Sequence, residues 1–204
     1  MDERPMEHMQ IALAIIKGAD KNFKVSMAGE YHKEIEKDLS DYSVASKFIL
    51  PKETLDRRKR AGFVTTYYTA CPEAYPNTFT FSPPAEGAFL GWYAAAKNFD
   101  GYLRWAFNSW PADPLRDSRF GTWSAGDTYF IYPGLRSSIR FERLIEGIQA
   151  FEKIKILEAE YTKNNSSPKL KTLQALLTRF DIANIQKAGA AAMVSKATAA
   201  LNTF

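Results

Sequence analysis

The sequence has few of the residues from which metal centres and disulfide frameworks are built. Its 204 residues include one cysteine, Cys71, and two histidines, His8 and His32. A single cysteine excludes a disulfide framework and a cysteine-based metal site within one chain. The two histidines are far apart and lack the spacing of a zinc site, so each is expected on the surface or in packing. We therefore expect neither a metal ion nor a cofactor.

Long apolar runs are also missing, so no segment is expected to span a membrane. No signal peptide is recognisable at the start of the sequence. The content of 46% hydrophobic and 25% charged residues is typical of a globular domain. The net charge of +4 is mild, because 23 acidic residues are interspersed with 27 basic ones. The basic run at residues 57–60 is expected on the solvated face of a polar helix, and no nucleic-acid partner is predicted.

Hydrophobic periodicity and turn signals predict helices and strands in alternation. Helices are expected over residues 5–17, 30–37, 51–60 and from Pro84 to about residue 99, and strands over residues 23–29, 41–48, 63–70 and 99–110. Alternation of this kind predicts a parallel sheet with right-handed crossovers, and therefore the α/β class. Four strands are half of a (β/α)8 TIM barrel. An open four-stranded sheet and the C-terminal half of such a barrel both fit the pattern.

The last third of the chain is expected to be helical. An insertion over residues 113–134 holds a short predicted strand at 128–132, and Ser138 is then expected to cap a long helix. Two extra C-terminal helices follow, over residues 169–180 and, rich in alanine, over about 184–201. We accordingly assign residues 1–160 to a half-barrel region and residues 161–204 to a C-terminal helical extension.

Aromatic residues and a side-chain amide gather at the end of the predicted strand 99–110. Trp105, Asn108 and Trp110 lie there, and ligands bind at strand ends in α/β barrels. Aromatic faces beside an amide suit a sugar, because its apolar C–H faces stack and its hydroxyls take the hydrogen bonds. The same aromatics could instead fill a core, and both interpretations stay open.

Two adjacent acids, Asp2 and Glu3, precede the first predicted helix. Ordinary glycosidases place two carboxylates on opposite sides of the scissile bond, which an adjacent pair cannot easily do. Such a pair suits substrate-assisted hydrolysis of a 2-acetamido sugar. In that reaction the Asp orients the acetamido nitrogen, and the Glu protonates the leaving oxygen and later activates water. The alternative is that both acids only stabilise the start of a helix.

Several short motifs carry a resemblance to a known family. They are Met1-Asp2-Glu3-Arg4-Pro5, the strand and loop at 67–72 and 75–77, Gly91-Trp92, the stretch 100–110, and the closing segments 132–134, 137–142 and 146–148. In this order, over about residues 1–160, they resemble the catalytic domain of glycoside hydrolase family 123, also described as domain of unknown function 4091. The chain departs from that family's pattern at Thr66, Ala70, Ala150 and Phe151.

The resemblance implies a (β/α)8 barrel and the activity of a retaining β-N-acetylgalactosaminidase, with an N-acetylhexosaminide as substrate. It implies that Asp2 orients the acetamido group and that Glu3 is the general acid/base. The implied substrate-binding residues are Tyr68, Asn77, Trp105, Asn108 and Trp110. Family members commonly carry upstream barrel strands and a β-sandwich, and the resemblance suggests a periplasmic or secreted protein.

The upstream strands have no counterpart in this sequence, and a pocket built from eight strand ends would lose half its wall. We therefore expect the isolated chain to be inactive, and to need an N-terminal barrel half or a second copy in a homodimer. The alternatives to a hydrolase are a non-catalytic module that binds glycans through its aromatic residues and a structural half-barrel that pairs with another copy to cover its open edges.

Overall fold

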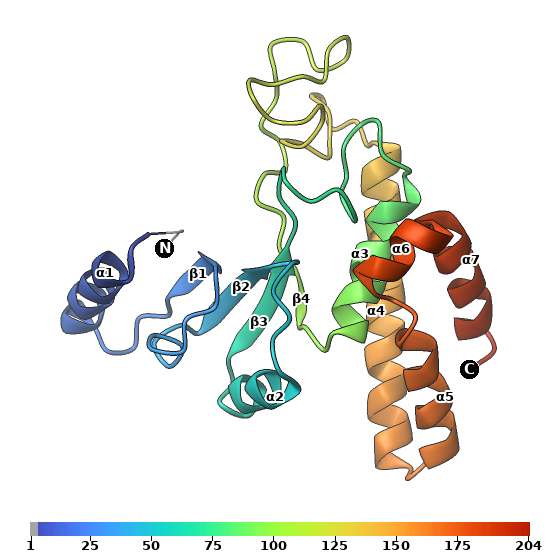
Figure 1. The fold of residues 1–204 in the computed structure, drawn as a ribbon, viewed down its shortest axis with the longest axis horizontal. Coiled ribbons are helices and arrows are strands. Elements are labelled where there is room, and N and C mark those ends of the chain that lie inside the picture. Colours follow the sequence, from blue (N-terminus) through green and yellow to red (C-terminus); the bar gives the residue numbers. More distant parts are fainter. Residues whose placement is uncertain (1–3) are drawn as a thin grey trace. The chain divides into compact units, whose positions relative to one another are not determined.

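The computed structural model describes residues 4–204, so the predicted catalytic residues Asp2 and Glu3 lie outside the described part of the chain. The elements in chain order are α1 (Met6–Ala19), β1 (Ser26–Gly29), β2 (Asp41–Ala45), α2 (Lys52–Arg60), β3 (Val64–Tyr68), α3 (Ala85–Ala96), β4 (Gly101–Tyr102), α4 (Ile139–Lys163), α5 (Ser167–Leu177), α6 (Ile182–Ala188) and α7 (Ala190–Leu201) (Figure 1).

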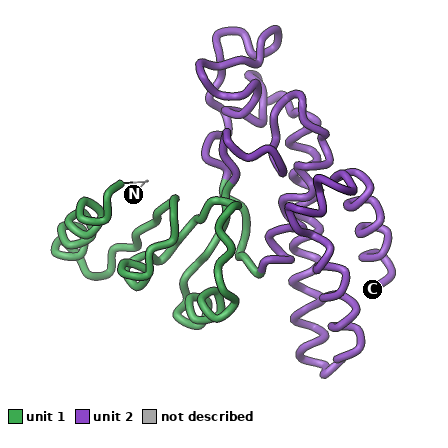
Figure 2. Tube along the Cα trace, viewed as in Figure 1, with its two compact units in different colours: residues 1–68, 98–103 green, residues 69–97, 104–204 purple. Residues whose placement is uncertain are grey.

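These elements fall into two compact units (Figure 2). Unit 1 comprises residues 1–68 and 98–103 and contains the whole sheet with α1 and α2. Unit 2 comprises residues 69–97 and 104–204 and contains α3 to α7 with two long loops. The domain boundary expected near residue 160 stays a prediction.

The sheet of unit 1 is parallel throughout, with its strands in the order β1-β2-β3-β4. Register pairs Met27 with Tyr42, and Tyr42 in turn with Thr65. Each strand follows the previous one directly in space, as expected for strands joined by crossovers. The predicted α/β class and the four parallel strands are therefore confirmed.

One face of this sheet packs against α2. Side chains alternate between the faces of a strand, so Tyr42 and Thr65 share a face. Arg58 of α2 lies over the Tyr42 ring, 5.4 Å from its centroid, and its Nε donates to Thr65 Oγ1 at 2.8 Å. Arg58 is buried and also donates to carbonyl oxygens of Glu36, Leu39 and Val64. The basic run was thus only partly predicted correctly: its second arginine is a core residue.

The opposite face of the sheet carries small polar side chains. Ser43 pairs with Thr66 in register, and the hydroxyl oxygens of both are buried without a hydrogen-bond partner among the described residues. Beside them, Asp41 accepts a hydrogen bond from Ser26 through Oδ2 at 3.0 Å, while its Oδ1 has no partner within residues 4–204. This face therefore has unsatisfied hydrogen-bonding capacity.

Unit 2 is built around α3, which packs against α4, α5 and α7 and is buried along nearly all its length. Gly91 of α3 and Gly147 of α4 let the two backbones approach closely, because a Cβ on Gly91 would lie 2.0 Å from the Gly147 carbonyl oxygen. Phe180, after α5, stacks on Trp92 with ring centroids 4.8 Å apart. These contacts fix the C-terminal helices to α3.

Four sequence-based assignments need correction. The expected helix at 30–37 is a series of turns, because the Tyr42 hydroxyl engages the Glu30 carbonyl and accepts from the His32 amide at 2.8 Å. The strand expected over 99–110 covers only Gly101–Tyr102. Residues 128–132 form isolated bridges and turns instead of a strand. The alanine-rich helix is divided in two at Gly189, whose φ is +73°. Ser138 caps α4 as predicted, accepting from the Phe141 amide at 3.1 Å.

Candidate functional site

The predicted site residues are distributed over both units. Tyr68 is the last residue of β3 in unit 1 and is buried. Asn77, Trp105, Asn108 and Trp110 lie in the loops of unit 2. The predicted pair Asp2 and Glu3 lies outside the described residues, so the roles assigned to it stay predictions. The geometry around the predicted site residues is therefore described for the four that lie in the loops of unit 2.

Asn77 holds the loop between β3 and α3. Its Nδ2 donates to the carbonyl oxygens of Glu73 and Ala74, at 3.3 and 2.8 Å. Its Oδ1 accepts from the Phe79 amide at 3.2 Å and from the Ser82 hydroxyl. With its side chain buried and its amide used in this way, Asn77 has a structural role here, and its predicted contact with a sugar stays a prediction.

Asn108 and Trp110 lie where two stretches of the long loop run antiparallel. Asn108 bridges to Tyr129, the Phe130 amide donates to Phe107 O at 2.8 Å, and Trp110 Nε1 donates to Ile131 O at 2.7 Å. The side-chain amide of Asn108 is exposed and has no hydrogen-bond partner among the residues that the structure describes. It is therefore available to a ligand, whereas the Trp110 indole N–H is already used.

A buried ion pair lies at the start of the same loop. Arg104 Nη2 donates to Asp127 Oδ1 at 2.7 Å, and the two side chains are only 6% and 1% exposed. Trp105 Nε1 lies 3.4 Å from the same carboxylate oxygen, and Arg104 Nε donates to Ala106 O at 3.1 Å. The second oxygen, Asp127 Oδ2, is buried without a partner among the described residues. The pair thus connects the residues after β4 with a distant part of the loop.

Trp105 stands beside a second indole that the sequence analysis did not select. The ring centroids of Trp105 and Trp123 are 5.7 Å apart and the ring planes are inclined by 34°. Trp123 also lies 6.0 Å from Phe120, with which it forms an antiparallel bridge. Trp105 is 42% and Trp123 is 41% exposed. In the sequence, Trp123 was marked only by its place in the insertion over residues 113–134.

Arg140 of α4 ties this loop to the loop that holds Asn77. Its Nη1 donates to Thr78 O at 2.7 Å and to Gly126 O at 2.6 Å. Burial lowers the pKa of Arg140. Burial, and then the neighbouring Tyr132, raise the pKa of Tyr129 to about 12. The interior of the loop region therefore holds a cationic arginine and a neutral phenol at physiological pH.

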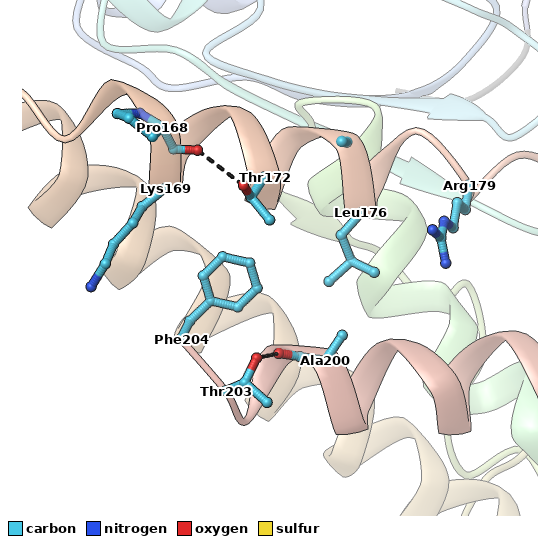
Figure 3. A pocket seen from close by; sticks show the side chains of 9 residues that line it. Pro168, Lys169, Thr172, Leu176, Arg179, Ala200, Thr203 and Phe204 are labelled. Atoms are coloured by element: carbon cyan, nitrogen blue, oxygen red, sulfur yellow. Dashed lines mark hydrogen bonds between the residues drawn. The ribbon is translucent and has the colours of Figure 1, made fainter.

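A groove of about 500 Å³ lies between α5 and α7 (Figure 3). Its lining includes Leu176 and Phe204, Lys169 in the first turn of α5, and Arg179, which follows that helix. None of the predicted site residues lines it, and no acidic side chain among the described residues does. The groove therefore has no group suited to acid/base chemistry on a glycoside.

Within residues 4–204, no three His, Cys, Asp or Glu side chains are placed as a metal site would require. No helix in that range combines the length and the apolar character needed to cross a bilayer.

Comparison with known families identifies the chain. The model of the glycoside hydrolase 123 catalytic domain matches residues 1–157, which is most of the sequence. The chain belongs to glycoside hydrolase family 123. The resemblance stated from the motifs is thereby confirmed, and the family match includes every residue assigned to the candidate site.

One solved structure similar to this one is that of a family 123 glycoside hydrolase from Clostridium perfringens, described for the hydrolysis of glycolipid glycans. The match has a TM-score of 0.82 and 28% sequence identity, and it covers 100% of this chain. It covers 39% of that protein's chain, which agrees with the predicted half of a barrel. No curated protein matches the chain significantly.

Proposed function

We propose that this family 123 domain belongs to a retaining β-N-acetylhexosaminidase that cleaves terminal β-N-acetylgalactosamine from glycans by substrate-assisted catalysis. The observation that carries the proposal is the match to the family's catalytic domain over residues 1–157, a range that includes Asp2 and Glu3. The relative from Clostridium perfringens, described as acting on glycolipid glycans, makes a glycolipid glycan the first substrate to test.

The proposed reaction needs two acids with separate tasks. The acetamido oxygen of the substrate attacks the anomeric carbon while the bond to the leaving oxygen breaks. Asp2 orients the acetamido nitrogen and stabilises its developing positive charge, and Glu3 gives its proton to the leaving oxygen. Water, deprotonated by Glu3, then attacks the anomeric carbon from the face that the leaving group left, and the bond between this carbon and the acetamido oxygen breaks. The two attacks come from opposite faces and each inverts the anomeric carbon, so the configuration of the sugar is retained.

The first experiment measures hydrolysis of an aryl β-N-acetylgalactosaminide by the chain and by its Glu3→Gln variant. The chain is expected to need a second copy or an N-terminal barrel half for activity, so turnover is measured over a range of concentrations. Any turnover that it shows should fall by about 10²–10⁴-fold in this variant, because the general acid/base is lost. Glu7→Gln is the matched control, because Glu7 is an exposed acid in the first turn of α1. If Asp2 and Glu3 served only to stabilise the start of the helix, Glu3→Gln and Glu7→Gln would hydrolyse the substrate at the same rate.

A second candidate function is glycan binding without hydrolysis. It is favoured by the exposed aromatic rings of unit 2 together with the fact that the chain spans 39% of the length of its hydrolytic relative. A folded sample that binds N-acetylgalactosamine glycans but shows no turnover would contradict hydrolysis by this chain and support the binding function.

A further inference from the structure

The structure places Trp123, which was not predicted as a site residue, beside the predicted residue Trp105. We propose that Trp105 and Trp123 form a corner that stacks against a further sugar unit of the glycan, and that the buried Arg104–Asp127 pair is the positioning device that fixes this corner. The proposal deepens the proposed function, since it concerns how the same glycan substrate is held.

The corner has the shape and chemistry that a sugar ring requires. The two indoles lie next to each other, inclined by 34° with centroids 5.7 Å apart, so a sugar ring seated on one of them lies close to the other. Each indole is about two-fifths exposed, at 42% and 41%, although large aromatic side chains are normally well buried. An apolar face beside water is suited to the C–H face of a neutral sugar.

The buried carboxylate of Asp127 holds Trp105 in place. The Trp105 indole N–H points to Asp127 Oδ1 at 3.4 Å, and the same oxygen accepts from Arg104 at 2.7 Å. The guanidinium also lies 5.9 Å from the centroid of the Trp105 ring. A buried ion pair is weak evidence for stability, because desolvation offsets the attraction. Its effect here is orientation, since one carboxylate oxygen holds both the arginine and the indole edge.

The surrounding loop makes such a device necessary. Residues 103–138 contain no helix or named strand, and loops longer than about 12–15 residues without secondary structure are uncommon unless they carry function. Gly121, with a φ of +61°, lies against the Trp123 ring: a Cβ there would be 3.5 Å from it. The positive φ favours glycine at this position, and the turn brings the backbone into van der Waals distance of the second indole.

The corner binds a sugar without cleaving its linkage. Its one contacting carboxylate, Asp127, is 1% exposed and paired with Arg104. A carboxylate held in this way can neither protonate a glycosidic oxygen nor activate water, for which direct reach is needed. In this proposal the corner holds a sugar unit other than the one that Asp2 and Glu3 are proposed to release.

Calorimetric titration of the 204-residue chain with a neutral tetrasaccharide ending in β-N-acetylgalactosamine tests the corner. Trp123→Ala should weaken binding about three- to tenfold, as expected for one lost aromatic contact. Leu135→Ala is the control, because Leu135 lies in the same loop, is 97% exposed and contacts no part of the corner. Equal affinity of Trp123→Ala and wild type, or no binding by the folded wild type, would overturn the proposal.

A double variant separates positioning from stability. Asp127→Leu removes the acceptor for the Trp105 indole N–H and leaves Arg104 buried without its anion, so it should lower the melting temperature and weaken binding about three- to tenfold. Adding Arg104→Met removes the unpaired charge and should restore most of the melting temperature, while the loss of affinity remains. Affinity that returns together with stability would overturn the positioning role. Should the double variant not fold, Trp105→Phe keeps an aromatic ring but removes the indole N–H together with part of the ring, and unchanged affinity there would overturn the positioning role as well.

These results are distinguishable from failure of the proposed function. The aryl substrate carries no further sugar, so its hydrolysis depends on Asp2 and Glu3. If turnover is lost in Glu3→Gln and the affinity for the tetrasaccharide is unchanged in Trp123→Ala, hydrolysis is supported and the proposed role of the corner is overturned. Binding through Trp123 without turnover would support the corner and contradict hydrolysis by this chain.

Discussion

At the scale of single residues, Glu86 shows how unit 2 accommodates a charge in its interior. Glu86 lies in the first turn of α3, and its side chain is 2% exposed. Its Oε2 accepts a hydrogen bond from the backbone N–H of Asn77 at 2.7 Å. Burial raises the pKa of Glu86, and the hydrogen bond from Asn77 lowers it by less. The carboxyl therefore both organises the loop that contains Asn77 and opposes folding when it is ionised.

This pKa shift predicts a pH dependence of stability. Because the folded-state pKa lies above the ordinary value of 4.5, the native state binds the proton more tightly than the unfolded state. The stability contributed by the protonated carboxyl is present below about pH 4 and is lost as the pH rises through the folded pKa. Glu86→Gln keeps an acceptor for Asn77 and cannot ionise. It should melt higher than wild type at pH 7, with the difference vanishing near pH 4.

Thermal unfolding followed by circular dichroism between pH 4 and 8 measures this difference. Glu86→Ala is the control: it removes the acceptor for the Asn77 amide and should be destabilised at every pH, because an unpaired buried N–H costs about 1–3 kcal/mol. A Glu86→Gln variant whose melting curve follows wild type at all pH values would show that burial does not penalise this carboxylate.

At the scale of elements, the packing of α3 on α4 is set by residues without large side chains. A Cβ on Gly147 would lie 2.5 Å from the Ala88 carbonyl oxygen, and one on Gly91 would meet the Gly147 backbone. Backbone atoms cannot move aside as the end of a flexible side chain can. This contact places Gly147 on the side of α4 that faces α3, whereas the next residue, Ile148, is 49% exposed.

We predict that Gly91→Ala destabilises unit 2 strongly. Overpacking of a tight core costs about 1–3 kcal/mol, and a clash with backbone belongs at the upper end of that range. In a chain of this size this corresponds to a fall in melting temperature of about 2–4 °C per kcal/mol. Gly18→Ala in α1 is the control, since nothing lies within 4 Å of its added Cβ, and it should stabilise α1 slightly. Equal melting of the two variants would contradict this account.

The elements also show what the sequence could predict. Strands with β-branched and aromatic residues at period two, such as β3, and the capped helix α4 were predicted because local pattern and packing agree. The strand through Trp105 was predicted too long, because Arg104 turns into the loop to reach Asp127, a partner far along the chain. Trp123 was missed for the same reason: its neighbour Trp105 is brought to it by tertiary structure alone.

At the scale of the whole molecule, the sheet of unit 1 has two open edges, since β1 and β4 each pair on one side among the described residues. An unpaired strand edge favours association with another chain. The unsatisfied hydroxyls of Ser43 and Thr66 and the Asp41 Oδ1 atom lie on one face of the same sheet. In the relative from Clostridium perfringens the corresponding region is 39% of a longer chain, so its sheet has more polypeptide available to it.

We therefore predict that the isolated chain self-associates through unit 1, as the sequence analysis expected for a half-barrel. Sedimentation velocity over a hundredfold range of concentration should show a dimer. Ala28→Lys should shift it to monomer, because Ala28 pairs in register with Ser43 and a lysine there places a charge on the polar face of an edge strand. Glu53→Gln makes the same change of charge on the exposed side of α2 and should leave the dimer intact. A wild-type chain that is monomeric at every concentration, or an Ala28→Lys variant that still dimerises, would contradict association through this sheet. Its polar face would then not be the surface through which copies of the chain associate.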